Sequence, residues 1–113
     1  MLTIDALQAF GADTADGLNR CMGNADFYIR LIGKAMEDKN FAALETALNA
    51  KDLDAAFEAA HSLKGVLGNL ALTPIYKPVF EMTELLRART DTDYGPMLSE
   101  VLAKKAELKA LMD

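Results

Sequence analysis

Cysteine, histidine and runs of basic residues are scarce in this sequence of 113 residues. The one cysteine, Cys21, excludes an intramolecular disulfide and a thiolate metal cluster, and we expect it to be a small packing residue. Lysine and arginine form no cluster longer than the pair Lys104-Lys105, and the net charge is −5. Because a basic footprint for a phosphate backbone is missing, we expect no nucleic acid among the partners.

Long apolar runs and glycine-rich phosphate loops are also absent. The apolar runs are too short for a membrane span, and the N-terminal MLTIDALQAF lacks the positive flank and the continuous apolar segment of a signal peptide. We therefore expect a cytoplasmic protein that does not bind a membrane. Without a phosphate loop of the Walker or kinase type, we expect the chain neither to bind ATP by those routes nor to phosphorylate itself.

The composition is that of a folded protein. Hydrophobic residues make up 51% of the chain and charged residues 26%, which is too apolar for a disordered segment. The length is typical of one domain with one core. We therefore expect residues 1–113 to form a single domain that works as a monomer.

Apolar residues recur at intervals of three and four between the glycines and prolines, which is typical of amphipathic helices. The pattern predicts a short helix over 3–10 with Thr3 as its N-cap, and a second helix that Asn24 caps. The polar stretch 37–40 bends or ends the second helix. The apolar spacing over 41–48 then either continues it or forms a separate short helix.

Three longer helices follow. Asp52 is predicted to cap the first, which runs to about Leu70 and carries a narrow apolar seam for packing against other helices. The members of that seam are Leu53, Ala56, Ala60, Leu63, Leu67 and Leu70. A last helix follows the stretch Asp93-Tyr94-Gly95-Pro96. With the segment 24–50, these helices predict an all-α fold, an up-and-down antiparallel four-helix bundle with a short N-terminal lid helix.

The start of the helix between these two is ambiguous. Thr73 followed by Pro74 is a good N-cap and first-position pair. If the helix starts at Pro74, Pro78 removes a backbone donor from inside it. The sequence therefore leaves two possible starts, one at Pro74 and one nearer Lys77. The turn before this helix is expected to be unusual.

The only histidine, His61, lies on the helix that Asp52 caps. At about 100° per residue, His61 falls roughly 130° from the centre of the apolar seam, so we expect it to be exposed, with Lys64 nearer the boundary. The same flank carries Gly65 and Gly68, each of which costs roughly 1 kcal/mol relative to alanine. Either another helix approaches closely there, or a partner protein brings its own surface up to the imidazole.

The chemistry open to this flank is narrow. A neutral imidazole is a competent nucleophile near neutral pH, and a cation one turn later can offset the charge of an incoming phosphoryl group. Phosphoryl transfer depends mostly on in-line positioning and charge neutralisation. The pair of His61 and Lys64 suits that reaction, with the phosphate supplied by another protein.

The segment AAHSLKG closely resembles the signature of the histidine-containing phosphotransfer (HPt) family of bacterial two-component phosphorelays. FGADTADGLNRCMGNADFYIRLI is similar to the opening segment of stand-alone members, and MTELLRAR to the end of their next bundle helix. The resemblance implies that His61 accepts a phosphoryl group from the aspartate of one receiver domain and passes it to another. Lys64 would balance the phosphoryl charge, while Gly65 and Gly68 would keep the approach clear.

The resemblance also implies partners and cofactors. Response-regulator receiver domains, and a hybrid histidine kinase, would dock on a flank that includes Phe57 and Glu58. The chain would need no cofactor, since the Mg²⁺ belongs to the receiver. The chain would itself be the phosphorylated intermediate, so the sequence leaves open whether it counts as an enzyme.

Two positions depart from the family pattern. The family commonly has glycine ten residues after the histidine, where this chain has Ala71. Phosphotransfer domains of chemotaxis kinases carry a glutamate that orients the imidazole, where this chain has Thr83. Thr83 or its neighbour Glu84, on a different helical bearing, is left as the candidate support for the imidazole.

Two other functions compete. Glu58-Ala59-Ala60-His61 has the Glu-x-x-His spacing of di-iron bundles, but those sites need two such motifs, so we expect no metal site. A non-catalytic helical adaptor could instead dock a receiver or kinase through Phe57, Gly65 and Gly68. The presence of both His61 and Lys64, which docking alone would not require, favours phosphotransfer.

Overall fold

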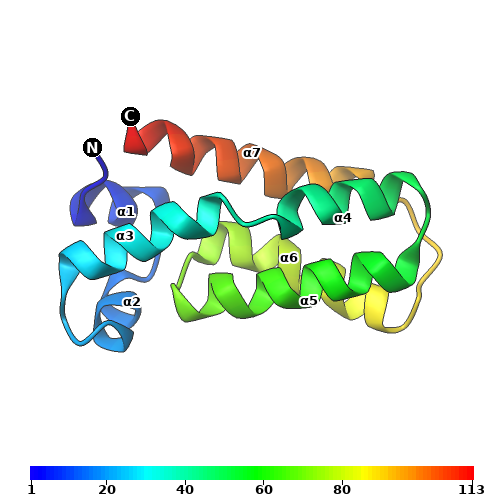
Figure 1. Cartoon of the computed structure of the whole chain (residues 1–113), viewed down its shortest axis with the longest axis horizontal. Coiled ribbons are helices and arrows are strands. Elements are labelled where there is room, and N and C mark those ends of the chain that lie inside the picture. Colours follow the sequence, from blue (N-terminus) through cyan, green and yellow to red (C-terminus); the bar gives the residue numbers. More distant parts are fainter.

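The computed structural model describes all 113 residues and contains helices but no strands (Figure 1). Its helices are α1 (Ile4–Phe10), α2 (Thr14–Arg20), α3 (Ala25–Met36), α4 (Asn40–Asn49), α5 (Leu53–Asn69), α6 (Thr73–Arg87) and α7 (Gly95–Met112). None of them combines the length and the apolar character needed to cross a membrane. The predicted all-α class is therefore confirmed.

The predicted N-caps are confirmed at the start of three helices. The side chains of Thr3, Asn24 and Asp52 each accept a hydrogen bond from the backbone N–H three residues later, at 3.0–3.1 Å. Such bonds satisfy donors that the first helical turn leaves without a partner. The short lid helix thus begins where the sequence predicts, and it ends at Gly11 in a left-handed conformation.

Helix α2 was not predicted. Asp13 caps it, with a carboxylate oxygen that accepts from the N–H of Asp16. The segment carries no apolar stripe of helical period, and its buried members are Thr14 and Gly17. A helix this short is stable only through packing, which sequence periodicity does not register.

The polar stretch after α3 separates two helices, which decides between the two alternatives for residues 41–48. Helix α3 ends at Met36 and α4 begins at Asn40. The carboxylate of Asp38 accepts a hydrogen bond from the Asn40 N–H at 2.8 Å. A side chain that bonds the backbone locally competes with a continuous helix, so the chain breaks here.

The start of α6 corrects the prediction. Leu72 is the N-cap, no side chain caps the helix, and the Thr73 hydroxyl instead lies 3.5 Å from the Ala71 carbonyl. The later start near Lys77 is also wrong, because Pro78 lies buried inside the helix. The donor that Pro78 lacks would have faced the carbonyl of Pro74 in the first turn, so the helix loses a hydrogen bond at its end rather than in its middle.

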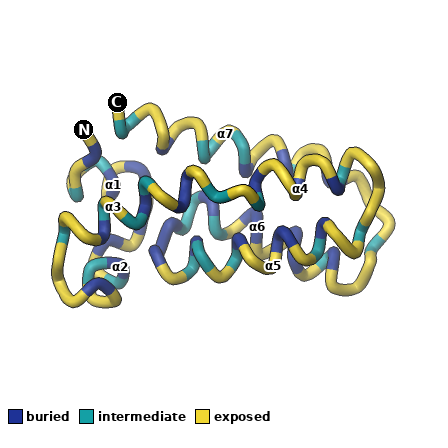
Figure 2. The backbone as a smooth tube through the Cα atoms, in the orientation of Figure 1, coloured by how far each residue is buried: buried dark blue, intermediate teal, exposed yellow.

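Helices α4, α5, α6 and α7 pack against one another in chain order and form a helical bundle (Figure 1). Their buried faces turn towards one another, while the outer faces stay exposed (Figure 2). The seam predicted on α5 is buried in all its members except Leu53, which is half-buried at the start of the helix. Cys21 is also buried, as expected for a packing residue.

Helices α1 to α3 gather at the end of the bundle where α5 turns into α6 (Figure 1). The hydroxyl of Tyr28 on α3 donates to the Leu70 carbonyl at 2.6 Å, and the Asp13 N–H donates to the Ala71 carbonyl at 3.0 Å. Ala71 itself adopts a left-handed conformation with φ of 55°. Glycine meets this requirement without strain, so the glycine that the resemblance leads us to expect at this position would fit the turn better than alanine does.

Candidate functional site

His61 lies in the middle of α5 with its side chain exposed, as the helical wheel predicts. The preceding residues Ala59 and Ala60 are buried and pack the opposite side of the helix into the core. Small residues there let the neighbouring helices approach α5 closely. The core packing therefore fixes the rotation of α5 and presents the imidazole to solvent.

The imidazole stacks on the ring of Phe57, one turn earlier on α5. The ring centroids are 5.6 Å apart and the planes differ by 20°. The side-chain hydrogen bonds at the end of α6 nearby join Arg89 to Asp54 and Arg87 to Glu84, and none of them includes His61. The contact of the imidazole in the structure is thus an aromatic stack on Phe57 and not a side-chain hydrogen bond.

Lys64 lies one turn after His61 and is half-buried. Its Nζ lies 5.7 Å from the ring centroid of Phe80 on α6, an exposed aromatic residue that also packs against Tyr76. An ammonium group over an aromatic face is weakly attracted by the ring and keeps its remaining donors in water. Lys64 is therefore a partly anchored cation beside the imidazole.

The two glycines on this flank have different surroundings. A Cβ added at Gly65 would meet no atom within 4 Å. At Gly68 the same addition would meet the ring of Tyr76 on α6 at 3.1 Å. Gly68 thus allows close packing against α6, as the first alternative predicts, whereas no part of the chain itself packs against Gly65.

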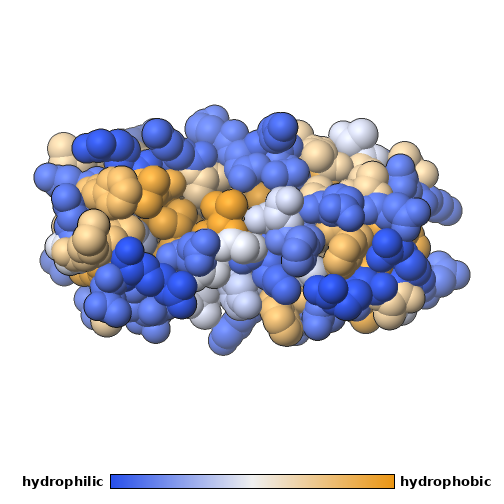
Figure 3. Space-filling model, turned by 60° about the horizontal axis from the view of Figure 1, so that its bottom comes forward, coloured by the Kyte–Doolittle hydropathy of each residue, from blue (hydrophilic) through white to orange (hydrophobic).

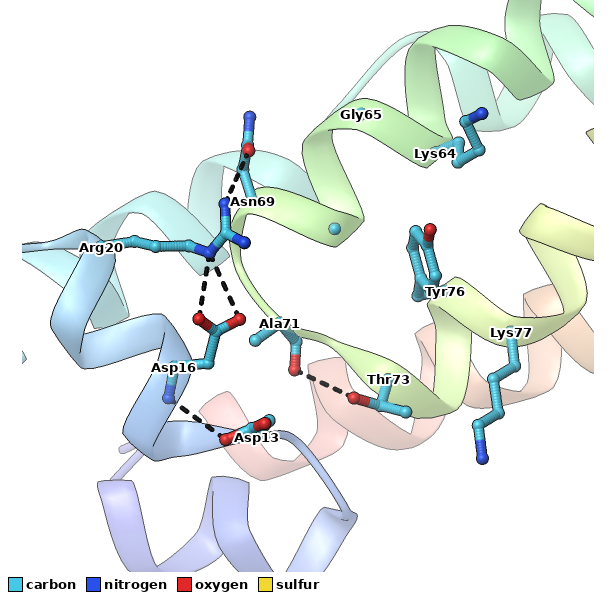
Figure 4. Close-up of a pocket in the computed structure, with 11 residues that line it drawn as sticks. Asp13, Asp16, Arg20, Lys64, Gly65, Asn69, Ala71, Thr73, Tyr76 and Lys77 are labelled. Atoms are coloured by element: carbon cyan, nitrogen blue, oxygen red, sulfur yellow. Dashed lines mark hydrogen bonds and ion pairs between the residues drawn. The ribbon is translucent and has the colours of Figure 1, made fainter.

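A groove of about 530 Å³ adjoins Lys64 and Gly65, between α2, α5 and α6 (Figure 4). Figure 4 shows Arg20 on one side of it and Tyr76 and Lys77 on the other. Arg20 is held in place by Asp16 at 3.2 Å and by the amide oxygen of Asn69 at 3.4 Å. Sequence reasoning missed this wall, because it depends on α2 and on side chains far apart in the chain.

Further along α5 the surface becomes more apolar. A shallower groove of about 330 Å³ between α3 and α5 is lined by Leu31, Ala35, Val66 and Leu70, with polar side chains around them. Figure 3 shows such hydrophobic areas interrupted by hydrophilic ones on this side of the molecule. Both grooves lie next to α5, so the helix that carries His61 has accessible surface on each of its flanks.

Thr83 and Glu84, the candidates for supporting the imidazole, have other partners in the structure. Thr83 is fully buried, and its hydroxyl donates to the Val79 carbonyl at 2.7 Å. Glu84 is exposed and accepts a hydrogen bond from Arg87 Nε at 3.2 Å. Neither side chain is hydrogen-bonded to His61.

Glu58 is exposed on α5, at the predicted docking flank. Together with His61 it has the Glu-x-x-His spacing, but no group of three or more histidine, cysteine or acidic side chains that could hold a metal ion comes together anywhere in the chain. A di-iron centre needs several inward-facing carboxylates. The arrangement around Glu58 and His61 does not provide them.

Comparison with known proteins identifies one family. The family model for the Hpt domain matches residues 34–113, which include α4 to α7 and the whole AAHSLKG segment. The residues before 34, which resemble the opening segment of stand-alone members, lie outside this match. Neither the curated proteins nor the solved structures give a significant match. Since the family model covers well over half of the chain and includes the helix that presents His61, the protein belongs to the Hpt domain family.

Proposed function

We propose that this protein is a phosphorelay intermediate in which His61 carries the phosphoryl group between receiver domains. Its family has a general role in two-component signalling, where Hpt domains exchange phosphoryl groups with receivers and kinases. The observation that carries the proposal is the exposed imidazole of His61, with Lys64 one turn later and an open surface at Gly65.

The transfer is a displacement at phosphorus. A ring nitrogen of neutral His61 forms the new bond to phosphorus, while the bond from phosphorus to the aspartyl oxygen of the receiver breaks and leaves its electron pair on the carboxylate. The other ring nitrogen releases its proton to water. In the second step the aspartate carboxylate of another receiver attacks phosphorus, the bond from phosphorus to the ring nitrogen breaks, and the ring takes a proton back from water to restore the neutral imidazole.

The surroundings of His61 suit such a reaction with few groups. Phosphoryl transfer depends on in-line approach and on neutralising the charge of the transferred oxygens. Lys64 supplies a cation beside the imidazole, and the Mg²⁺ that we expect on the receiver supplies the rest. Thr83 and Glu84 have other hydrogen-bond partners, so we assign neither of them an acid or base role.

The proposal includes finer features of the protein. The helices α4 to α7, with α3 extending the first of them, would act as an up-and-down antiparallel four-helix bundle with α1 as its lid. The docking surface would include Phe57, Glu58 and Gly65 on α5, together with the groove that Lys64 borders. A cytoplasmic monomer that exchanges phosphate with receivers, and with a hybrid histidine kinase, fits these features.

The test is transfer of labelled phosphate from a phosphorylated receiver. Wild-type protein should acquire an acid-labile label, as expected for phosphohistidine, and His61→Gln should acquire none. Ser62→Gln, which alters an exposed residue next in the chain but on a different helical bearing, is the matched control and should be labelled normally. Equal labelling of wild type and His61→Gln would overturn the proposal.

An adaptor that docks a receiver without carrying phosphate is the second candidate. The exposed ring of Phe80 and the bare surface at Gly65 favour docking as such, whether or not transfer follows. The two functions separate in cells that lack the protein. If His61→Gln restores signalling there as well as the wild type does, the adaptor is correct and phosphotransfer is not.

A further inference from the structure

We propose that Phe57 is a positioning residue for His61, and that Arg89, in the turn just after α6, holds Phe57 in place. The inference rests on the proposed function of His61, and it changes the role of Phe57 from docking to orientation. It is carried by a chain of side-chain contacts that runs from the end of α6 across the start of α5 to the imidazole.

The first contact in this chain joins Phe57 to His61. These residues are four apart on α5, a spacing that places two side chains one above the other on the same face. Their rings are nearly parallel, with 20° between the planes and 5.6 Å between the centroids. Aromatic pairs at such separations attract each other beyond their burial alone.

The second contact joins Phe57 to the end of α6. The guanidinium carbons of Arg87 and Arg89 lie 5.1 and 5.0 Å from the centroid of the Phe57 ring. Guanidinium groups within about 6 Å of a ring centroid are attracted by the ring face. Two cations, one from the last turn of α6 and one from the turn that follows it, therefore restrain the half-buried Phe57 ring on which the imidazole stacks.

Arg89 is in turn fixed at both ends of its guanidinium group. Its Nε donates to the Asp54 carboxylate at 2.6 Å, and its Nη1 donates to the Leu86 carbonyl at 2.5 Å. Its backbone is left-handed, with φ of 52°, a conformation that glycine adopts more easily. Arginine in this conformation is therefore strained relative to glycine. Its side chain, however, forms the hydrogen bond to Asp54 and the contact with Phe57, which glycine could not form.

The stack on Phe57 orients the imidazole and leaves both of its nitrogens free. An imidazole that attacks phosphorus must be oriented, but a carboxylate that orients it occupies one ring nitrogen. Stacking restrains the plane of the ring and leaves its edges, where both nitrogens lie, free of hydrogen bonds. Phe57 can therefore orient His61 without a carboxylate, and orientation is a large part of the barrier in such transfers.

The experiment compares Phe57→Leu with Phe57→Tyr, which keeps the ring. One readout is the NMR shift of the His61 ring protons, which an aromatic neighbour changes through its ring current. The others are the rate of labelling by phosphoramidate, which needs no receiver, and the dependence of transfer rate on receiver concentration. Phe57→Leu should lose the ring-current shift and slow both labelling and maximal transfer by about tenfold. The half-saturating receiver concentration should stay within about twofold, and Phe57→Tyr should behave as wild type.

Arg89→Gln tests the same chain of contacts without altering the ring. It should reduce the ring-current shift and slow maximal transfer by about threefold, a smaller effect because Arg87 still contacts Phe57. Arg20→Gln is the matched control, since Arg20 is also exposed and ion-paired but contacts Asp16 and Asn69 instead. It should leave the shift unchanged.

The outcomes separate the two proposals. If Phe57→Leu raises the half-saturating receiver concentration while maximal transfer and the ring-current shift are kept, Phe57 is a docking residue and the inference is wrong. An Arg89→Gln protein with an unchanged shift and rate would also overturn it, even if Phe57→Leu failed to fold. If no donor labels His61 in the wild type, the proposed function fails, and the NMR shift still reports whether the stack exists.

Discussion

Gly17 on α2 and Gly65 on α5 both lie inside a helix, but the space around their Cα atoms is filled at Gly17 and open at Gly65. Both lie inside helices, where glycine is unfavourable relative to alanine. A Cβ added at Gly17 would overlap the phenol group of Tyr28, whereas one added at Gly65 would meet nothing. Glycine inside a helix thus occurs both where the fold leaves no room for a side chain, as at Gly17, and where it leaves room for one, as at Gly65.

The largest effect is expected at Gly17. Gly17→Ala should lower the free energy of unfolding by roughly 3 kcal/mol, because the methyl group displaces Tyr28 and the buried hydroxyl loses its bond to Leu70. Urea unfolding measures the change. The double variant Gly17→Ala with Tyr28→Phe removes the phenol oxygen, so it should be less destabilised than the two single changes predict. Additive changes would place the cause elsewhere.

Alkaline pH should weaken the same region. Burial, followed by the nearby negative charges of Cys21, Asp13 and Asp16, raises the pKa of Tyr28 from 10.0 to about 12. The folded state then holds this proton more tightly than the unfolded state. The resulting stability, about 2–3 kcal/mol, is fully present below pH 10 and is lost as the pH rises to 12.

Unfolding titrations of wild type and Tyr28→Phe between pH 9 and pH 12 measure this loss. The other groups that titrate in this range, including Tyr94, whose pKa burial also raises, are present in both proteins. Their contributions cancel in the comparison. Parallel curves for the two proteins would show that Tyr28 is not the source.

The smallest changes in the free energy of unfolding are expected for alanine substitutions at Gly65 and Gly68. Gly65→Ala should raise the free energy of unfolding by about 1 kcal/mol, since alanine is the better helix former and nothing opposes it. Gly68→Ala should gain much less, because its methyl group would press on the Tyr76 ring at 3.1 Å. Equal gains in thermal or urea unfolding would contradict the difference in their surroundings.

These glycines illustrate what the sequence reveals and what it leaves out. Local rules predicted the caps at Thr3, Asn24 and Asp52, and the seam on α5 predicted the exposure of His61, because both depend on residues close in the chain. The same rules gave the wrong start for α6, because the effect of Pro78 on the helix depends on how far Pro78 lies from the first helical residue.

The site beyond His61 depended on contacts between distant residues. The stack on Phe57 has a local signal in the spacing of four residues, but its support by Arg89 spans the α5–α6 pair and a left-handed residue. The wall formed by Arg20 requires α2, a helix without an apolar stripe. Sequence periodicity carries no information about such pairings.

The turn between α5 and α6 has a consequence for the modularity of this protein. The match to the family begins at residue 34, but two backbone carbonyls of the turn accept hydrogen bonds from Tyr28 and Asp13, outside that range. A fragment cut at the family boundary would leave both carbonyls without these donors and uncover the end of the histidine helix. The hydrogen bonding of this turn therefore extends beyond the residues that the family model matches. A chimaera that transplants the surface around His61 should carry the first three helices with it.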